Sequence, residues 1–248
     1  MAVFGNIEDI PARDFRSAQG KLIVALDFPS GDKALAFVDQ LEGLCRWFKV
    51  GLELYLAAGN RIVGQLKEQG FSVFLDLKLH DIPNTVAGAV RSVSSLGVDL
   101  LTVHASGGPA MLQAAAEAAA SQPQAPRLLA VTVLTSMDAG QLSAIGVSDS
   151  PAEQALRLAR AAHRAGIAGL VCSPEEAARM RRELPDSVLV TPGIRPAGAE
   201  IGDQKRIATP AAALSAGADY LVVGRPITQA ARPAAAAEAI LAEMSQGL

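Results

Sequence analysis

The sequence alternates short β-rich runs with helical stretches rich in Ala, Leu, Glu and Arg from residue 21 onward, and this alternation constrains the fold most. About eight strand-then-helix units in 248 residues are the number and length that a closed (β/α)8 barrel (TIM barrel) needs. A doubly wound open sheet is the main alternative, but no Gly-x-Gly-x-x-Gly turn supports it. The predicted strands cover residues 21–27, 46–51, 71–78, 98–104, 128–135, 169–172, 188–191 and 219–224. The predicted helices cover residues 32–44, 59–69, 85–96, 109–120, 151–165, 174–184, 210–216 and 228–244.

Proline and glycine mark the ends of these helices. Proline is accepted in a first helical turn, and glycine readily takes the left-handed conformation that closes a helix. The first-turn prolines are Pro109, Pro174 and Pro210, and the closing glycines are Gly70, Gly97, Gly166 and Gly217. We therefore expect one α/β domain over residues 1–248, a single (β/α)8 barrel in which residues 1–20 form an N-terminal extension.

Composition narrows the class of protein. A formal net charge of -3 gives no basic stripe for nucleic acid, so we expect no nucleic acid partner. Cys45 and Cys172 each lie in an apolar segment and are interpreted as reduced core residues. Residues 1–16 lack the apolar core of a signal peptide, and no apolar run is long enough to span a bilayer. We expect a cytoplasmic protein with no membrane association.

One stretch, residues 74–85, combines a strand pattern with charge. Leu75, Leu77 and Leu79 share one face of the strand, and Phe74, Asp76 and Lys78 share the other. The other predicted strands are apolar on both faces, as in a buried parallel sheet. A carboxylate and an ammonium inside such a sheet are tolerated only when paired, so the stretch is either a structural ion pair or a working site. We favour the working site because perturbed charges gather at functional clefts.

The ends of the last two predicted strands favour a phosphate site. Barrels often bind phosphate with the loops after strands seven and eight. Glycine lets main-chain N–H groups approach phosphate oxygens, and arginine supplies a bidentate partner; Gly193, Gly224 and Arg225 meet these needs. The long polar loop 195–209, which contains Gln204, is a candidate lid over the substrate. The substrate is therefore expected to carry a phosphate.

The charged residues indicate carbanion chemistry. Lys49, Asp76, Lys78 and Asp81 have no nucleophilic serine or cysteine arrangement beside them, and the three histidines show no zinc-ligand spacing. What remains is an alternating array of carboxylates and ammonium groups. Two unit charges ~3 Å apart at an effective dielectric of ~20 interact by roughly 5 kcal/mol, so such an array is rigid. It suits a reaction whose carbanion needs immediate protonation by Lys78.

The motif Asp76-x-Lys78-x-x-Asp81-Ile82-x-x-Thr85 resembles the signature of the orotidine 5′-phosphate decarboxylase family. The resemblance covers nearly the whole chain and also includes Ala25-Leu26-Asp27, Phe48-Lys49-Val50-Gly51, Val131-Thr132-Val133-Leu134-Thr135-Ser136, Thr191-Pro192-Gly193-Ile194-Arg195 and Val223-Gly224-Arg225-Pro226-Ile227. It implies loss of CO₂ from C6 of orotidine monophosphate to give uridine monophosphate, the last step of pyrimidine nucleotide synthesis. No cofactor and no metal are implied.

The resemblance also implies a role for each residue. Asp27 and Lys49 would hold the ribose hydroxyls, Asp76 would sit beside the departing carboxylate, and Lys78 would protonate C6. Asp81 and Thr85 would reach into the partner's site, which makes the enzyme a C2 homodimer with composite sites. The remaining expected substrate contacts are Ile82, Thr135, Pro192, Arg195, Gln204, Gly224 and Arg225.

Two alternatives stay open. The first is a related sugar-phosphate enzyme, such as 3-keto-gulonate 6-phosphate decarboxylase or hexulose phosphate synthase, which shares Asp-x-Lys-x-x-Asp but uses Mg²⁺. Lys49, the Thr135 region and the Ile82-x-x-Thr85 extension favour the orotidine reaction. The second is a catalytically silent nucleotide-binding protein, against which the complete charge array argues. Ribulose phosphate epimerases are set aside because they need histidine ligands where this chain has lysines.

Overall fold

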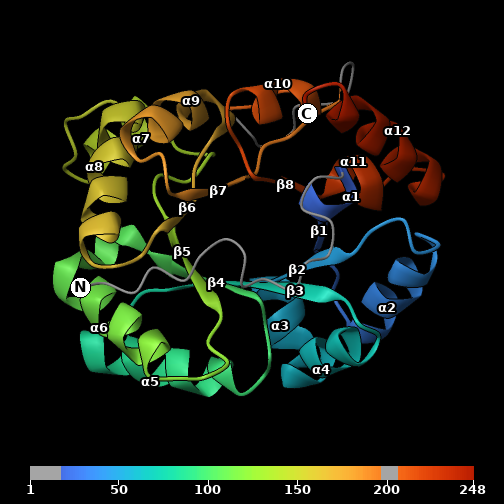
Figure 1. Ribbon diagram of the computed structural model, residues 1–248, viewed down its shortest axis with the longest axis horizontal. Helices are drawn as coiled ribbons and strands as arrows, with labels where there is room; N and C mark the ends of the chain where they lie inside the picture. The colour runs from blue at the N-terminus through green and yellow to red at the C-terminus, as the bar shows by residue number, and fades with distance from the viewer. Residues whose placement is uncertain (1–17, 197–205) are drawn as a thin grey trace.

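The computed structural model describes residues 18–196 and 206–248, and these residues form a closed barrel of eight parallel strands in the order β1 to β8. Figure 1 shows the strands at the centre with the helices around them. The strands are β1 (Leu22–Leu26), β2 (Trp47–Gly51), β3 (Ser72–Leu79), β4 (Leu100–His104), β5 (Arg127–Val131), β6 (Gly169–Val171), β7 (Val188–Thr191) and β8 (Tyr220–Val223). The predicted (β/α)8 fold is confirmed.

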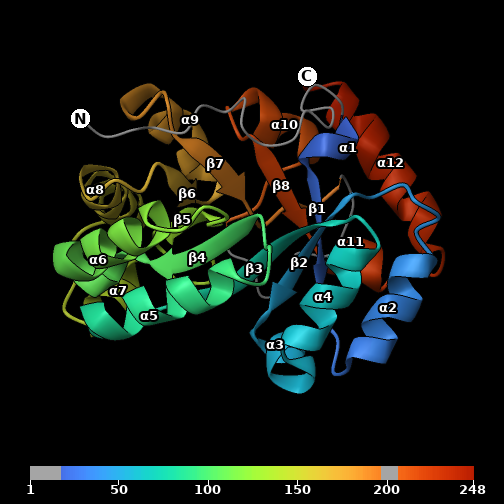
Figure 2. The same ribbon diagram turned by 60° about the horizontal axis from the view of Figure 1, so that its bottom comes forward.

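The helices run on the outside of the barrel (Figure 2). They are α1 (Ala18–Lys21), α2 (Gly31–Asp39), α3 (Leu52–Ala58), α4 (Asn60–Glu68), α5 (Pro83–Ser94), α6 (Gly108–Ala120), α7 (Ala139–Ala144), α8 (Pro151–Arg164), α9 (Pro174–Glu183), α10 (Pro210–Ser215), α11 (Arg225–Thr228) and α12 (Pro233–Ser245), with a 3₁₀ turn, η2, at Ala105–Gly107. Among the described residues, no helix is long and apolar enough to cross a membrane.

Alternation along each strand divides the core into two parts. In β1, Ile23 and Ala25 point into the barrel, whereas Leu22, Val24 and Leu26 pack outward against the helices. Aromatic side chains fill much of the barrel interior, where the rings of Trp47 and Tyr220 meet edge to face with centroids 5.2 Å apart. The barrel is therefore a packed core, and polar side chains find room only at its ends.

The prolines and glycines predicted to mark helix ends are confirmed in these positions. All four closing glycines have positive φ, from 67° at Gly97 to 102° at Gly217. Pro109, Pro174 and Pro210 all lie at the first or second position of their helices. Cys45 and Cys172 are buried free thiols, and burial raises the pKa of each to about 12.

Several predicted boundaries are wrong. The helix predicted over 228–244 begins later, because residues 229–232 are not helical and Pro233 begins α12; Thr228 is the last residue of the separate short helix α11. The helix predicted over 32–44 ends at Asp39, and Glu42 and Gly43, both with positive φ, follow it. Helix α3 was not predicted. Residues 18–20 of the expected N-terminal extension begin α1, and residues 1–17 lie outside the described part of the chain.

Asp219 forms hydrogen bonds that connect the adjacent strands β7 and β8 at the amino end of the barrel. The Asp219 N–H donates to the Leu189 carbonyl (2.9 Å), and the Asp219 carboxylate accepts the Leu189 N–H (2.7 Å) and the Arg181 guanidinium (2.6 Å). The same arrangement recurs between β4 and β3: the Asp99 N–H donates to the Val73 carbonyl (3.0 Å), and the Asp99 carboxylate accepts the Val73 N–H (2.7 Å) and the Lys67 ammonium (2.7 Å). These contacts lie before the strands begin, at the end opposite to that expected for chemistry.

We expect Asp219→Ala to lower the free energy of unfolding by about 2 kcal/mol, because it removes two charge-assisted hydrogen bonds from a partly exposed carboxylate. The kcat/KM for substrate should not change. Urea unfolding followed by circular dichroism measures the first quantity. The control is Asp186→Ala, an exposed aspartate just before β7. Equal stability of the two variants would contradict the assignment.

Candidate active site

Four charged side chains meet at the carboxyl end of the barrel. Asp27 follows β1, Lys49 lies in β2, and Asp76 and Lys78 lie near the end of β3. Strand register places Ala25 beside Lys49 and Gly51 beside Asp76. Because Trp47 and Phe74 point into the barrel, the alternation places Lys49 and Asp76 on the same inner face, one step closer to its open end.

The four side chains form one continuous series of ion pairs. Lys49 Nζ lies 3.2 Å from Asp27 Oδ1 and 3.7 Å from Asp76 Oδ2. Lys78 Nζ lies 2.9 Å from both oxygens of Asp76. The exposed fraction of the side chain is 13% for Asp76 and 11% for Lys49, but 57% for Asp27. The sign of charge therefore alternates along the series Asp27–Lys49–Asp76–Lys78, in which Asp27 faces the solvent and Asp76 is buried between the two lysines.

Asp76 is the most constrained of these groups. Burial by itself would raise the pKa of Asp76, but Lys49 and Lys78 and the hydrogen bonds from Lys78 and Thr102 hold it below its ordinary value. Asp76 is thus ionised at neutral pH. By linkage, this depressed pKa contributes stability above pH ~4, the unfolded value, and the contribution is lost as the pH falls further.

Glycine makes room for the array. A Cβ atom added at Gly51 would lie 2.8 Å from Lys49 Nζ and 3.5 Å from Asp27 Oδ1. A Cβ atom at Gly224 would lie 3.6 Å from Asp27 Oδ2. Asp27 therefore lies between the ammonium of Lys49 and the glycine that ends β8, and it links the charged array to the region in which the sequence predicts phosphate binding.

The backbone of β3 is irregular at this point. Lys78 has a φ of 50°, one of two positive values among the described non-glycine residues. This conformation costs an L-amino acid roughly 1–2 kcal/mol. The pairing of β3 with β4 shifts register between Leu75 and Leu79. Strain of this kind at a charged strand end is a feature of functional sites.

The predicted phosphate region is only partly described. Gly193 has a φ of 80°, and Arg225 is exposed at the start of α11 beside Gly224. Arg195 is buried, and its Nη1 donates to the Ile194 carbonyl at 2.8 Å. Pro192 is half-buried. Gln204 and residues 197–205 of the predicted lid lie outside the described residues, so Arg225 and Gly224 carry the phosphate prediction.

Asp81 and Thr85, which are predicted to act across a dimer interface, lie on the surface of the single chain, as does the predicted substrate contact Ile82. Asp81, Ile82 and Thr85 are all exposed at the start of α5, and Ile82 is 67% exposed. Asp81 Oδ1 accepts the Ile82 N–H (2.6 Å), which orients its carboxylate at the helix entry. Thr135, expected to border the pyrimidine, is half-buried just past β5.

The sequence did not single out Arg206, a residue that shapes the site. Its guanidinium pairs with the buried Glu176 and donates to the carbonyls of Val133 (3.0 Å) and Leu134 (2.9 Å). Burial raises the pKa of Glu176, and Arg206 opposes the rise. These carbonyls belong to the predicted strand 128–135, which ends at Val131. Arg206 therefore supports the turn that leads to Thr135, a link across 72 residues that no local pattern signals.

Two histidines stack beside the array. The rings of His80 and His104 are nearly parallel, with centroids 5.3 Å apart, and His104 Nδ1 contacts Ser106 Oγ at 2.6 Å. Burial lowers the pKa of His104 most, and electrostatic repulsion from the nearby His80 and Lys78 lowers it further. His104 is thus a hydrogen-bonded histidine near the array. No three His, Cys, Asp or Glu side chains within residues 18–196 and 206–248 cluster as ligands for a metal ion.

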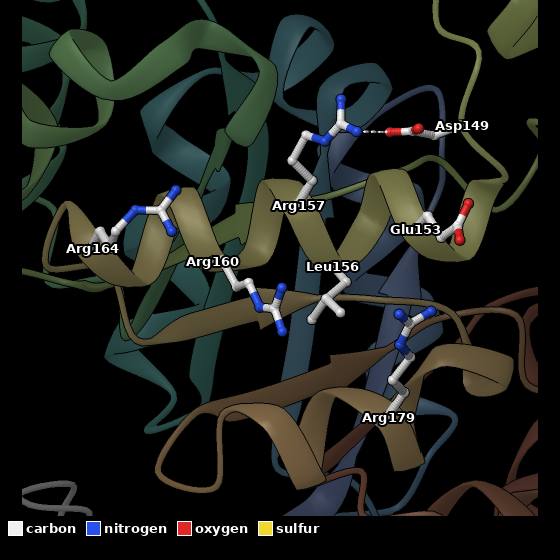
Figure 3. A pocket seen from close by; sticks show the side chains of 7 residues that line it. All are labelled: Asp149, Glu153, Leu156, Arg157, Arg160, Arg164 and Arg179. Carbon is white, nitrogen blue, oxygen red and sulfur yellow. Dashed lines mark ion pairs between the residues drawn. The ribbon is translucent and has the colours of Figure 1, made fainter.

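A separate groove of about 430 Å³ lies on the outer surface between α8 and α9. Arg160 and Arg179 extend into it from the two helices, next to Leu156 (Figure 3). Arg157 pairs with Asp149, and Arg160 with Glu183 (2.6 Å). The groove is thus lined by surface ion pairs, and none of the predicted site residues lines it.

Comparisons with known proteins identify the family of the chain. The family model described as "Orotidine 5'-phosphate decarboxylase / HUMPS family" matches residues 20–240. An orotidine 5′-phosphate decarboxylase of Halorhodospira halophila is 57% identical over 227 residues, which are 91% of this chain and 96% of that protein. One from Pseudomonas fluorescens is 53% identical over 92% of this chain and 99% of its own length.

The solved structures give the same result. The crystal structure of orotidine 5′-phosphate decarboxylase from Lactobacillus acidophilus superposes with a TM-score of 0.79 at 39% identity. The match covers 90% of this chain and 98% of that one. The fold and the similarity thus agree over nearly the whole length. The chain belongs to the orotidine 5′-phosphate decarboxylase / HUMPS family.

Proposed function

We propose that this protein converts orotidine 5′-monophosphate into uridine 5′-monophosphate and CO₂, with Lys78 as the proton donor to C6. The observation that carries the proposal is the array Asp27–Lys49–Asp76–Lys78, whose charges alternate over contacts of 3.2, 3.7 and 2.9 Å. The similar proteins from H. halophila and P. fluorescens bear the name of this activity. The protein is a carboxy-lyase of pyrimidine nucleotide synthesis.

The chemistry explains why the array alternates. When the bond between C6 and the carboxylate breaks, CO₂ leaves and the electron pair stays on C6. This carbanion lies in the plane of the ring and gains little from delocalisation, so it needs a cation nearby and then a proton. The Lys78 ammonium supplies both: its N–H bond breaks, a C6–H bond forms, and the neutral amine recovers a proton from water.

Asp76 prepares the site for this step. Its carboxylate lies beside the departing CO₂ and holds Lys78 Nζ by contacts of 2.9 Å to both oxygens, which fixes the donor before substrate enters. A preorganised ion pair does not have to reorient as charge develops, and this is an efficient form of transition-state stabilisation. Repulsion between Asp76 and the substrate carboxylate would add ground-state destabilisation.

The rest of the substrate follows the line of the array. Asp27 and Lys49 bind the ribose hydroxyls, and the 5′-phosphate lies toward Gly224 and Arg225, which adjoin Asp27. Thr135 borders the pyrimidine, and Pro192, Arg195 and Gln204 complete the binding region. Binding energy at the phosphate can then assemble the site around the ring. No cofactor or metal takes part.

The active form is proposed to be a homodimer in which Asp81 and Thr85 complete the partner's site, next to the substrate contact Ile82. These residues are exposed in the single chain, as are Leu52 (50%) and Leu56 (81%) on α3. Helices α3 and α5 follow the neighbouring strands β2 and β3, so apolar side chains emerge next to the open end of the barrel. Exposed apolar groups of this size are typical of an interface.

We propose a cytoplasmic location for the enzyme.

The first test is decarboxylation followed by ultraviolet absorbance with EDTA present. We expect rapid turnover by the wild type and a kcat lower by roughly 10²- to 10⁴-fold or more for Lys78→Ala, because the general acid is lost. Lys33→Ala, an exposed lysine on α2, is the control. Turnover that stops with EDTA and returns with Mg²⁺ would instead favour a sugar-phosphate enzyme. Tight binding of uridine monophosphate without turnover would indicate a silent binding protein.

The shared site is tested by mixing two inactive variants. Lys78→Ala and Asp81→Ala homodimers should each be impaired in both sites. After subunit exchange, half of the molecules become heterodimers, and one site in each heterodimer contains neither substitution. Activity should therefore return toward a quarter of the wild-type value per site. No gain after demonstrated exchange would mean that Asp81 acts within its own chain.

The phosphate site is tested with the nucleoside that lacks the phosphate. Arg225→Ala should lower kcat/KM for the nucleotide by roughly 10- to 100-fold, since a charge-assisted contact is lost. For the nucleoside, wild type and variant should be equal, because the partner of Arg225 is absent. Arg61→Ala, on the outer helix α4, is the control. A variant with wild-type kcat/KM, or one equally impaired with the nucleoside, would contradict this assignment.

A further inference from the structure

Thr102 occupies an unusual position between β3 and β4. Leu75 pairs with Leu101, and Leu79 pairs with Val103. Between these pairs β3 has three residues, Asp76 to Lys78, and β4 has only Thr102. The two extra residues of β3 therefore bulge opposite a single threonine, which is fully buried.

The Thr102 hydroxyl hydrogen-bonds both reacting residues of the strand, through the main chain of Lys78 and the side chain of Asp76. Lys78 N–H donates to Thr102 Oγ1 at 2.8 Å, and Thr102 Oγ1 donates to Asp76 Oδ1 at 3.0 Å. A main-chain N–H can only donate and an ionised carboxylate can only accept, so the hydroxyl hydrogen has one orientation. The hydrogen bonds run in one direction, from the Lys78 backbone through Thr102 to the Asp76 carboxylate.

These two bonds fix the features that make the array unusual. The bond from Lys78 N–H stabilises a residue whose φ is 50°, and this local backbone directs the Lys78 side chain back toward Asp76. The bond to Asp76 Oδ1 sets the rotation of the carboxylate while Lys78 Nζ contacts both oxygens. Without the hydroxyl, both the carboxylate and the ammonium could move by the fraction of an ångström that matters for proton transfer.

We propose that Thr102 is a positioning residue for decarboxylation, which holds Asp76 and Lys78 at their working separation without touching the substrate. The inference rests on the proposed function, because it assigns Thr102 to the same reaction. The proposed ribose and phosphate contacts lie at the ends of β1, β2 and β8, whereas the two bonds of Thr102 go to the Lys78 main chain and to Asp76 on β3. Loss of the hydroxyl should therefore affect the chemical step and leave substrate binding largely intact.

The test compares Thr102→Val with Thr102→Ser. Valine keeps the shape of threonine and removes both hydrogen bonds, so kcat should fall roughly 10- to 100-fold with KM changed by less than about threefold. Serine keeps the hydroxyl and should retain kcat within about threefold of the wild type. The matched control is Thr132→Val: Thr132 is equally buried, on the chain just after β5, and its hydroxyl donates to the Val171 carbonyl at 3.0 Å.

Folding is checked by circular dichroism and thermal midpoint. If Thr102→Val does not fold, Thr102→Ala and Thr102→Ser form a second pair that differs by one oxygen atom, and the same fall in kcat should separate them. A wild-type kcat in folded Thr102→Val, a rise in KM alone, or an equal fall in Thr132→Val would overturn the inference. A wild type that does not decarboxylate orotidine monophosphate would instead overturn the proposed function.

Discussion

The structure depends on one buried carboxylate. Asp76 is 13% exposed at the top of an apolar barrel, where an unpaired charge would be strongly destabilising. Lys78, Thr102 and Lys49 surround it, and each depends on a local departure from regular structure. Lys78 takes a left-handed backbone, Thr102 faces a bulge, and Lys49 needs the absent side chain of Gly51. The irregularities at this end of the barrel thus share a single electrostatic cause.

The two ends of the barrel use the same chemistry for different purposes. At the amino end, Asp99 and Asp219 each bind a main-chain N–H and one cation, which ties neighbouring strands together. At the carboxyl end, Asp76 binds cations that also face the open site. The first arrangement satisfies the carboxylate with the backbone, and the second leaves charged groups that a substrate can meet. Stability and reactivity are thereby built from the same residue types at opposite ends.

Local patterns predicted most of the fold because the barrel is a repetition of local units. Strand apolarity and the left-handed glycines such as Gly97 and Gly217 depend on near neighbours, and the structure agrees with them. The features missed depend on distant contacts. Arg206 binds the Leu134 carbonyl across 72 residues, and the bulge at Asp76–Lys78 forms only against Thr102. In the site, the sequence indicated which charges would pair, but not the register that brings Asp76 and Lys78 within 2.9 Å.

The bulge also limits how the length of β3 can vary. Between the pairs Leu75–Leu101 and Leu79–Val103, β3 carries two more residues than β4. Because two is an even number, Leu75 and Leu79 lie on the same face and both pack against the outer helices. One added or deleted residue would move every later side chain to the opposite face of the strand, so Leu79 would point into the barrel. An even number of added or deleted residues would keep the alternation, so the parity of the strand, more than its length, preserves the direction of Lys78.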